Sequence, residues 1–258
     1  MNPAHQQHGW TVRFDSGLSG AAAVGLDAGF AVVVDVLSFT TSLSVAVDRG
    51  IEVLPFRWRD ESAAAYAGQH DAVLAVGRRE AVADSVSLSP GSIRRAVGLD
   101  RLVLPSPNGS AIAHSLAESA RVCVGASLRN ARAVAEWIAA NDDGNASVAI
   151  IAAGERWPDG TLRPAVEDVW GAGAVLAELG RLRPGWAMSP ESEMAVAAWR
   201  AVRKRVGVAL EQCASGRELT AAGYGPDVRV AAEVDESCSV PVLVGGVFVD
   251  RGQRHASS

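Results

Sequence analysis

The stretch "AVVVDVLSFTTS", Ala31–Ser42, decides the fold class and raises the question of function. Its apolar start ends at a single acid, Asp35, and four hydroxyl side chains follow within positions 38–42. A continuous run of Ala and Val is typical of a parallel-sheet strand that is buried on both faces. The stretch therefore predicts a buried strand that presents a carboxylate and several hydroxyl groups at its carboxyl end.

The same order of a short apolar run and a helical segment recurs along the chain. This alternation predicts an α/β protein with a largely parallel or mixed central sheet and helices on both faces. We expect strands at about 30–37, 51–56, 71–77, 101–106, 120–127, 146–154 and 240–250. We expect helices at about 40–50, 59–70, 109–119, 128–140, 164–180 and 189–208.

Length and charge restrict the classes of protein to which the chain can belong. The chain has 258 residues, of which 48% are hydrophobic, so it can bury one large core. We expect a single domain over 1–258, with flexible ends at 1–10 and 251–258 and a hinge near 181–192. The net charge of −5 argues against general nucleic-acid binding, which usually needs a basic face.

Other sequence features bear on compartment and partners. No apolar run reaches the length of a membrane span, and residues 1–10 lack the charged and apolar regions of a signal peptide. The three cysteines are too widely spaced for a disulfide framework or a zinc site. We therefore expect a cytoplasmic protein that contacts neither nucleic acid nor membrane. A small-molecule ligand and a homodimer would suit an enzyme of this size.

Polar side chains follow several of the predicted strands. Asp35 follows the first, and Ser106–Ser110, Gly125–Asn130 and Gly154–Arg156 follow three others. Ligands of open α/β sheets bind at the carboxyl ends of strands, and helix N-termini attract anions. Ordinary helix caps and turns would place the same residue types there. The repetition of such turns favours a polar, anion-binding crater at one edge of the sheet.

A second source of carboxylates is the segment "RPAVEDVWGAG", Arg163–Gly173. Pro164 suits the first position of a helix, so Glu167 and Asp168 fall in its first turn. Acids at this place complement the helix dipole, which is an ordinary structural role. They also suit magnesium, because hard cations prefer carboxylate oxygens. The sequence leaves both interpretations open.

Two phosphatase motifs can be compared with the chain. The Asp-x-Asp motif needs a second acid two residues after Asp35, where the chain has Leu37. The Cys-x5-Arg motif matches "CVGASLR", with Cys123 and Arg129, so a cysteine-dependent phosphatase is an alternative. However, Leu128 stands where a phosphate-binding loop usually needs a Gly with positive φ. Because Cys123 lies in an apolar run, we expect its thiol to be buried and unreactive.

Taken in order, several segments resemble the 2-phosphosulfolactate phosphatase (ComB-like) family. The segments are "VVVDVLSFTTS", "SPNGS", "GASLRNARAVA", "AAGE" and "EDVWGAG", and residues 215–242 resemble the family's C-terminal pattern. The resemblance extends over about 30–245. It implies a Mg²⁺-dependent phosphatase with a ComB-like fold, which converts (2R)-phospho-3-sulfolactate to 3-sulfolactate and phosphate in coenzyme M biosynthesis.

The resemblance and the polar turns together imply roles for individual residues. Catalysis is expected from Asp35, Glu155 and Asp168, and Mg²⁺ binding from Asp35, Glu167 and Asp168. Residues expected to contact the substrate or its phosphate are Thr40, Thr41, Asn108, Gly109, Ser110, Arg129, Asn130 and Arg156.

The chain departs from the family pattern at Ser38, where the family usually has Arg. The middle region also differs, with "GRRE" (77–80) and "LSP" (88–90) in place of a Gly-Glu-Arg and an Asn-Ser-Pro motif. Loss of an anion-binding Arg removes a strong charge-assisted contact. The residues that would replace it are Arg78, Arg79, Arg129 or Arg156. An alternative function is therefore small-anion binding by the same fold without catalysis.

Overall fold

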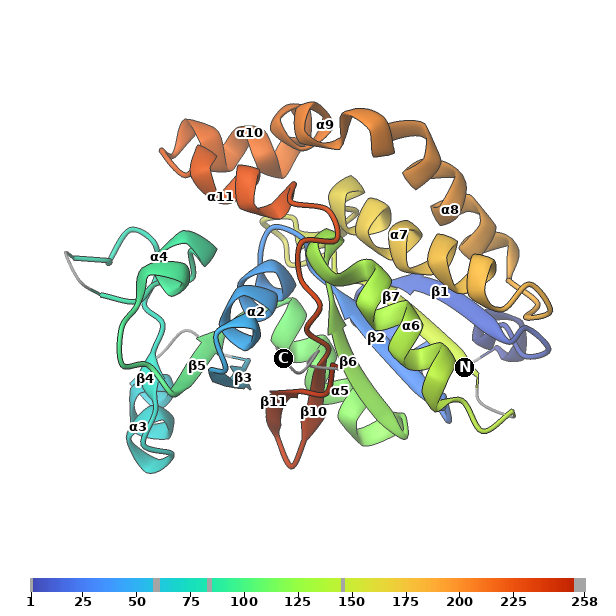
Figure 1. The fold of residues 1–258 in the computed structure, drawn as a ribbon, viewed down its shortest axis with the longest axis horizontal. Coiled ribbons are helices and arrows are strands. Elements are labelled where there is room, and N and C mark those ends of the chain that lie inside the picture. Colours follow the sequence, from blue (N-terminus) through green and yellow to red (C-terminus); the bar gives the residue numbers. More distant parts are fainter. Residues whose placement is uncertain (1, 58–60, 83–84, 145–146, 253–258) are drawn as a thin grey trace, which may run out of the picture.

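The computed structural model describes residues 2–57, 61–82, 85–144 and 147–252 (Figure 1). Its centre is a nine-stranded sheet in the order β1-β7-β2-β6-β10-β11-β3-β5-β4. The strands are β1 (Val12–Ser16), β2 (Phe30–Val34), β3 (Glu52–Phe56), β4 (Val73–Leu74), β5 (Arg101–Pro105), β6 (Val122–Ala126), β7 (Val148–Ala152), β10 (Pro241–Val244) and β11 (Val247–Asp250). A separate two-stranded hairpin consists of β8 (Glu155–Arg156) and β9 (Leu162–Arg163).

The sheet contains two parallel groups of strands. β1, β7, β2 and β6 form one group, and β3, β5 and β4 form the other. The antiparallel β10–β11 hairpin joins the groups, with Val242 opposite Val124 of β6 and Phe248 opposite Val53 of β3. The sheet is therefore mixed and mostly parallel, which confirms the predicted fold class.

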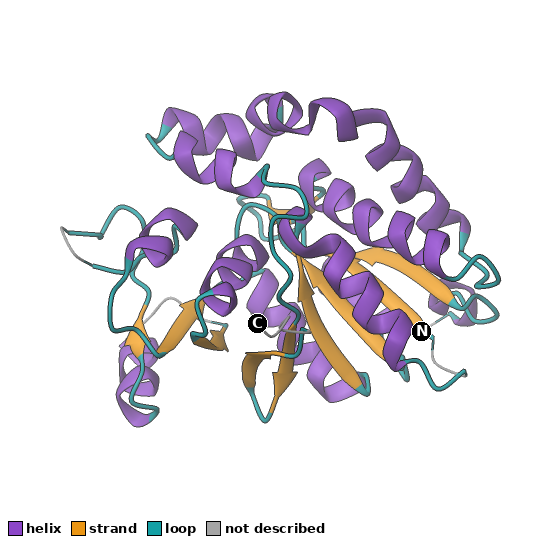
Figure 2. Cartoon of the chain, in the orientation of Figure 1, coloured by secondary structure: helices purple, strands orange, loops and turns teal. Residues whose placement is uncertain are grey.

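Helices cover both faces of this sheet (Figure 2). The helices are α1 (Gly17–Val24), α2 (Phe39–Asp48), α3 (Glu61–Gln69), α4 (Pro90–Arg95), α5 (Gly109–Ser119), α6 (Ala131–Asn141), α7 (Val166–Leu182), α8 (Pro190–Val202), α9 (Val206–Gln212), α10 (Ala214–Ala221) and α11 (Gly225–Ala231). α6 and α7 pack in one apolar cluster, whereas α1, α2 and α5 pack in another. Within the described residues, no helix has both the length and the apolar character needed to cross a bilayer.

Strand β2 explains why the opening stretch determines the fold class. Val32 and Val34 belong to the apolar cluster with α6 and α7, and Ala31 and Val33 belong to the cluster with α1 and α5. All four side chains are buried because successive residues of a strand point to opposite faces. A strand with apolar side chains on both faces is most stable in the interior of the sheet, where helices cover both faces, and β2 lies between β7 and β6.

The sequence did not predict β1 and α1. Val12 and Phe14 are buried, but Arg13 and Asp15 alternate with them and interrupt the apolar run. β1 lies at the edge of the sheet and pairs with β7. Gly17, at φ +68°, makes the turn from this strand into α1.

Two expected elements are each divided in the structure. The segment 240–250 is a hairpin, because Gly245 and Gly246 adopt positive φ between β10 and β11. The helix expected over 189–208 consists of α8, a 3₁₀ turn at Arg203–Arg205 and α9. Apolar periodicity continues across such breaks, so it does not reveal where a helix changes direction.

The segments expected to be flexible or hinged make several contacts. Gln7 is buried, and its side-chain amide both donates to Phe14 O (2.8 Å) and accepts from Phe14 N (3.2 Å). The turn between α7 and α8 is joined to β1, since Ser189 N donates to Val12 O (2.9 Å). Arg251 N donates to Val240 O, whereas residues 253–258 lie outside the described part of the chain.

Two glycines of α7 allow close packing on both sides of the helix. A Cβ at Gly171 would lie 2.6 Å from Val36 Cγ2 and 2.8 Å from Val34 Cγ1. A Cβ at Gly173 would lie 2.1 Å from the backbone oxygen of Ala195 in α8. These glycines therefore fix the separation of α7 from β2 and α8.

We predict that Gly173→Ala lowers the free energy of unfolding by about 1–3 kcal/mol, because the added methyl group overpacks the contact with α8. Gly68→Ala is the matched control, since Gly68 also lies in a helix but has nothing within 4 Å of an added Cβ. That control should be neutral or stabilising by up to about 1 kcal/mol. Urea denaturation followed by circular dichroism measures both changes, and equal stability of the two variants would contradict the close contact.

Candidate active site

Carboxyl ends of strands from both parallel groups meet at one cavity. Asp35 follows β2, Glu155 comes shortly after β7, and Asn108 comes shortly after β5. All three residues line a cavity of about 270 Å³. Helix α10 contributes Ser215 and Glu218 to its wall. The structure therefore brings three of the predicted site residues together, from segments that are far apart in the sequence.

Asp35 connects the cavity with the starts of α2 and α5. Its Oδ1 accepts a hydrogen bond from Phe39 N in the first turn of α2 (3.0 Å). A Cβ at Gly109, the first residue of α5, would lie 2.7 Å from Asp35 Oδ2 and 2.4 Å from the Phe39 ring. Gly109 thus serves the site by having no side chain, which lets α5 begin directly beside the carboxylate.

The hydroxyl groups of Thr40, Thr41 and Ser110 are used inside the protein. Thr40 Oγ1 accepts from Asp35 N (2.9 Å) and donates to Asp35 O (2.8 Å). Thr41 Oγ1 donates to Val36 O (2.8 Å), and Ser110 Oγ donates to Leu104 O (3.1 Å). The three side chains are buried and do not line the cavity, so they shape the strand–helix turns instead of contacting phosphate as expected.

The side chain of Asn108 makes hydrogen bonds with both residues of β8. Its Nδ2 donates to Glu155 Oε2 (2.9 Å), and its Oδ1 accepts from Arg156 Nε (3.1 Å). Arg156 itself is exposed and does not line the cavity. Burial and then the charge of Asp35 raise the pKa of Glu155 to about 7. The cavity therefore concentrates negative charge.

Asp168 lies behind the cavity and joins two strand ends. Its Oδ1 accepts from Val36 N (2.7 Å), and its Oδ2 accepts from Gly154 N (2.9 Å). The residue is only 3% exposed. Burial and the nearby charges of Asp35 and Glu167 raise the pKa of Asp168, while the two N–H groups act in the opposite direction. Asp168 is a structural bridge between the turns that carry Asp35 and Glu155.

The metal set expected from sequence, Asp35, Glu167 and Asp168, does not form. Both oxygens of Asp168 accept backbone N–H groups, and Glu167 is buried next to Cys213. Burial and then the charge of Glu167 raise the pKa of the Cys213 thiol to about 12. In the described ranges, no group of three or more His, Cys, Asp or Glu side chains is placed to hold a metal ion. The carboxylates that remain at the cavity are those of Asp35, Glu155 and Glu218.

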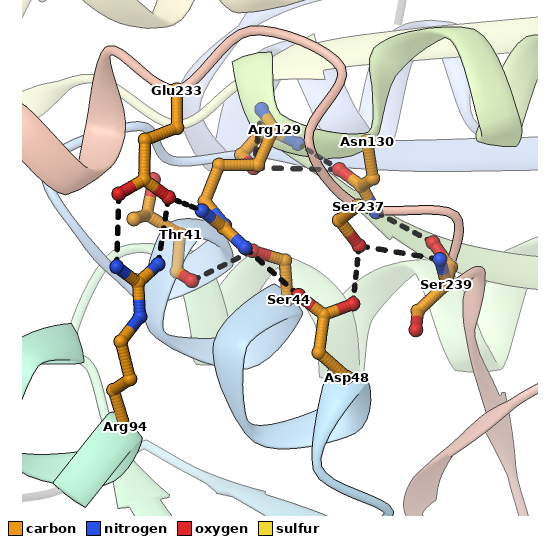
Figure 3. A network of polar contacts seen from close by, with 10 residues as sticks. Thr41, Ser44, Asp48, Arg94, Arg129, Asn130, Glu233, Ser237 and Ser239 are labelled. Carbon is orange, nitrogen blue, oxygen red and sulfur yellow. Dashed lines mark hydrogen bonds and ion pairs between the residues drawn. The ribbon is translucent and has the colours of Figure 1, made fainter.

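Arg129 and Asn130 lie away from the cavity, in a buried polar network (Figure 3). Arg129 donates to Ser44 Oγ (3.1 Å), to Asp48 Oδ2 (2.8 Å) and to Glu233. Asn130 Oδ1 accepts from Ser127 N, and its Nδ2 donates to the backbone oxygens of Gly125 and Ser239. The network connects α2 and β6 with the segment after α11. The two residues therefore have structural partners, and neither lines the cavity that holds Asp35 and Glu155.

The cysteine-dependent alternative has little support in the structure. Cys123 is 3% exposed within β6, and burial raises the pKa of its thiol to about 12. Its candidate partner, Arg129, pairs with Asp48 and Glu233. A reactive thiolate needs an accessible, electropositive setting, and this thiol has neither.

Sequence reasoning assigned no individual role to three polar residues that line the cavity, Ser106, Ser215 and Glu218. Arg78, which also lines it, was one of four candidates to replace the family's Arg, and Ser38 and Ser42 belong to the hydroxyl groups expected after the first strand. Ser215 and Glu218 come from α10, far from the other motifs in the sequence. The available signal for them was the resemblance of residues 215–242 to the family's C-terminal pattern, which did not identify individual side chains.

Comparison with known proteins identifies the group to which this fold and site belong. The chain belongs to the 2-phosphosulfolactate phosphatase family, because the family model described as 2-phosphosulpholactate phosphatase matches residues 22–246. A probable 2-phosphosulfolactate phosphatase of Deinococcus radiodurans is 31% identical over 230 residues, which are 86% of this chain and 90% of that protein. A protein of the same description from Thermus thermophilus is 33% identical over 221 residues, or 84% of this chain and 88% of its own.

We predict that Asp168→Asn lowers the free energy of unfolding by about 1–3 kcal/mol, with or without Mg²⁺. An amide has one acceptor oxygen, so its NH₂ group would point at one of the two backbone N–H groups that the carboxylate now binds. Thermal and urea denaturation measure the change. A variant as stable as the parent that loses only Mg²⁺ binding would contradict the structural assignment.

We also predict that Cys123→Ser keeps most phosphatase activity and that Cys123 in the folded parent resists alkylation. Exposed Cys238 provides an internal reference, since iodoacetamide at pH 8 should modify it first. Peptide mass spectrometry after brief labelling identifies the modified cysteine. Rapid modification of Cys123 together with loss of activity would instead support a cysteine nucleophile.

Proposed function

We propose that this chain is a Mg²⁺-dependent phosphatase that hydrolyses a small anionic phosphate monoester. The names of its relatives suggest 2-phospho-3-sulfolactate, which would give 3-sulfolactate and phosphate. The observation that carries the proposal is the presence of Asp35 and Glu155 in one cavity, beside the N-termini of α2 and α5.

The carboxylates of the cavity fit a magnesium ion better than the set expected from sequence. Mg²⁺ in phosphoryl-transfer enzymes is usually held by one or two carboxylates, with water and substrate phosphate completing its shell. Asp35 and Glu155 would supply this pair, without a protein cage of three or more ligands. The charge of Asp35 already raises the pKa of Glu155, and a cation would relieve this repulsion. When bound, Mg²⁺ would neutralise charge on phosphoryl oxygens.

The groups around the carboxylates suit the binding of phosphate. Ser106 lines the cavity, and its Oγ accepts from Gly109 N (3.1 Å), which leaves its O–H free to donate to a phosphate oxygen. The starts of α2 and α5 at the same cavity favour negative charge through their dipoles. Asn108 holds Glu155 in place through its amide. Asp35 would supply the negative charge that the reaction requires, as metal ligand, nucleophile or base.

We predict that Asp35→Asn lowers the rate of hydrolysis by at least about 100-fold and leaves the fold intact. Asn can still accept the hydrogen bond from Phe39 N that caps α2, so the helix start is preserved. It cannot supply negative charge to a metal ion or to a phosphoryl group. Initial rates with 2-phospho-3-sulfolactate and p-nitrophenyl phosphate across a Mg²⁺ titration measure the effect.

The control for this experiment is Asp100→Asn, at an exposed position outside the cavity. Circular dichroism establishes that both variants are folded, and removal of metal by EDTA should abolish the parent activity until Mg²⁺ is restored. An Asp35→Asn variant with near-parent rates at saturating Mg²⁺ would reduce Asp35 to a helix cap. Anion binding without any turnover by the parent would favour the binding-protein alternative.

A further inference from the structure

Arg78 is the one basic residue that lines the cavity among the residues that the structure describes. The acids there are Asp35, Glu155 and Glu218. A phosphate ester with a second anionic group would bring further negative charge to this place. A cation bound by Asp35 and Glu155 would balance the phosphoryl end, so the rest of such a ligand needs a positive partner from the chain itself.

The side chain of Arg78 is held in one direction by three contacts. Its Nε donates to Asp227 Oδ2 (2.9 Å), and its Nη2 donates to Ser38 Oγ. Its guanidinium carbon lies 5.7 Å from the centre of the Tyr224 ring. The side chain of Asp227 is 4% exposed, and that of Arg78 is 16% exposed. The guanidinium is therefore fixed before any ligand arrives, which lowers the entropic cost of binding.

Part of the guanidinium remains available to a ligand. In the described residues, Arg78 Nη1 makes no hydrogen bond, because the protein contacts use Nε and Nη2. A planar guanidinium binds carboxylate or sulfonate oxygens through charge-assisted hydrogen bonds. We propose that Arg78 binds the second anionic group of the substrate, a carboxylate or a sulfonate. This assignment rests on the proposed phosphatase function.

The other arginines considered for this task are placed elsewhere. Arg79 is exposed and does not line the cavity. Arg129 is paired with acids in the buried network, and Arg156 is exposed and donates to Asn108. Ser38, the position at which the family usually has Arg, is short enough to accept a hydrogen bond from Arg78. The positively charged side chain at the cavity thus comes from the segment after β4, and not from the start of α2.

Asp227 is a positioning residue for this anion site. Its Oδ2 accepts from Arg78, and its Oδ1 accepts from Ser89 Oγ (2.5 Å) at the N-cap of α4. The acid in α11 therefore fixes the direction of the guanidinium relative to the start of α4. Loss of this contact should weaken binding of the second anionic group more than it changes turnover.

The first test measures binding without catalysis. Isothermal titration calorimetry with 3-sulfolactate, and separately with lactate, compares the parent with Arg78→Gln, Arg78→Lys and the matched control Arg79→Gln. We expect Arg78→Gln to weaken 3-sulfolactate binding by about 10- to 100-fold, as for loss of a hydrogen bond to a charged group. The affinity of Arg78→Lys should lie between those of the parent and Arg78→Gln, because Lys keeps the positive charge but lacks the planar guanidinium. Arg79→Gln should bind 3-sulfolactate as the parent does.

The second test measures selectivity. We expect Arg78→Gln to lower the ratio of kcat/KM for 2-phospho-3-sulfolactate to that for p-nitrophenyl phosphate by about 10- to 100-fold. Asp227→Asn should raise KM for 2-phospho-3-sulfolactate with a smaller change in kcat. Repeating the assay with 2-phospholactate, which has a carboxylate and no sulfonate, shows which group Arg78 binds, since only a substrate that carries that group responds to the substitution.

The outcomes separate this inference from the proposed function. Folded Arg78→Gln and Arg78→Lys variants with parent-like 3-sulfolactate affinity and an unchanged selectivity ratio would overturn the role of Arg78. A parent protein that binds 3-sulfolactate through Arg78 but hydrolyses no phosphate ester would support the anion site and refute the phosphatase proposal. If Arg78→Gln does not fold, the comparison of Arg78→Lys with the parent decides the question.

Discussion

The arrangement of the candidate site depends on the hydrogen bonds from two backbone N–H groups to the carboxylate of Asp168. One N–H belongs to Val36, next to Asp35, and the other to Gly154, next to Glu155. A single buried side chain therefore sets the distance between the turns that follow β2 and β7. Each oxygen of the Asp168 carboxylate accepts one of these N–H groups. If either turn moved, a buried N–H group would lose its hydrogen bond, which costs free energy. Asp168 thus has a structural role, and it positions the turns from which Asp35 and Glu155 face the cavity.

The cavity combines acids that repel one another with groups that favour anions. Burial and the charge of Asp35 both raise the pKa of Glu155, because two carboxylates lie close together in a partly buried site. The charge of Arg163 lowers the pKa of Glu155. The starts of α2 and α5 and the Arg78 guanidinium, which lie at the same cavity, favour anions. Such a distribution is poorly suited to an apolar ligand. It suits the small, strongly anionic phosphate ester and the divalent cation that we propose.

Two parts of the molecule far apart in sequence complete the site. The segment after β4 supplies Arg78, and α10 and α11 supply Glu218 and Asp227. The chain after α11 is attached to the core by the Arg129 network, in which Asp48 and Glu233 neutralise the buried guanidinium (Figure 3). Arg129 has the spacing from Cys123 that the cysteine-phosphatase motif requires. Its guanidinium donors are nevertheless bound to Asp48 and Glu233, so the residue stabilises the fold.

The sequence by itself determined the α/β class, most of the parallel strands and the polar turns that follow them, because burial on both faces of a strand and the position of a turn are local properties. It also placed Asp35, Asn108 and Glu155 at strand ends that prove to share a cavity. Tertiary structure decided which polar atoms face that cavity. Thr40, Thr41, Ser110, Asp168 and Arg129 have the residue types of a phosphate site, yet their polar atoms are bound to the protein. Side-chain direction depends on partners from distant segments, and no local pattern records those partners.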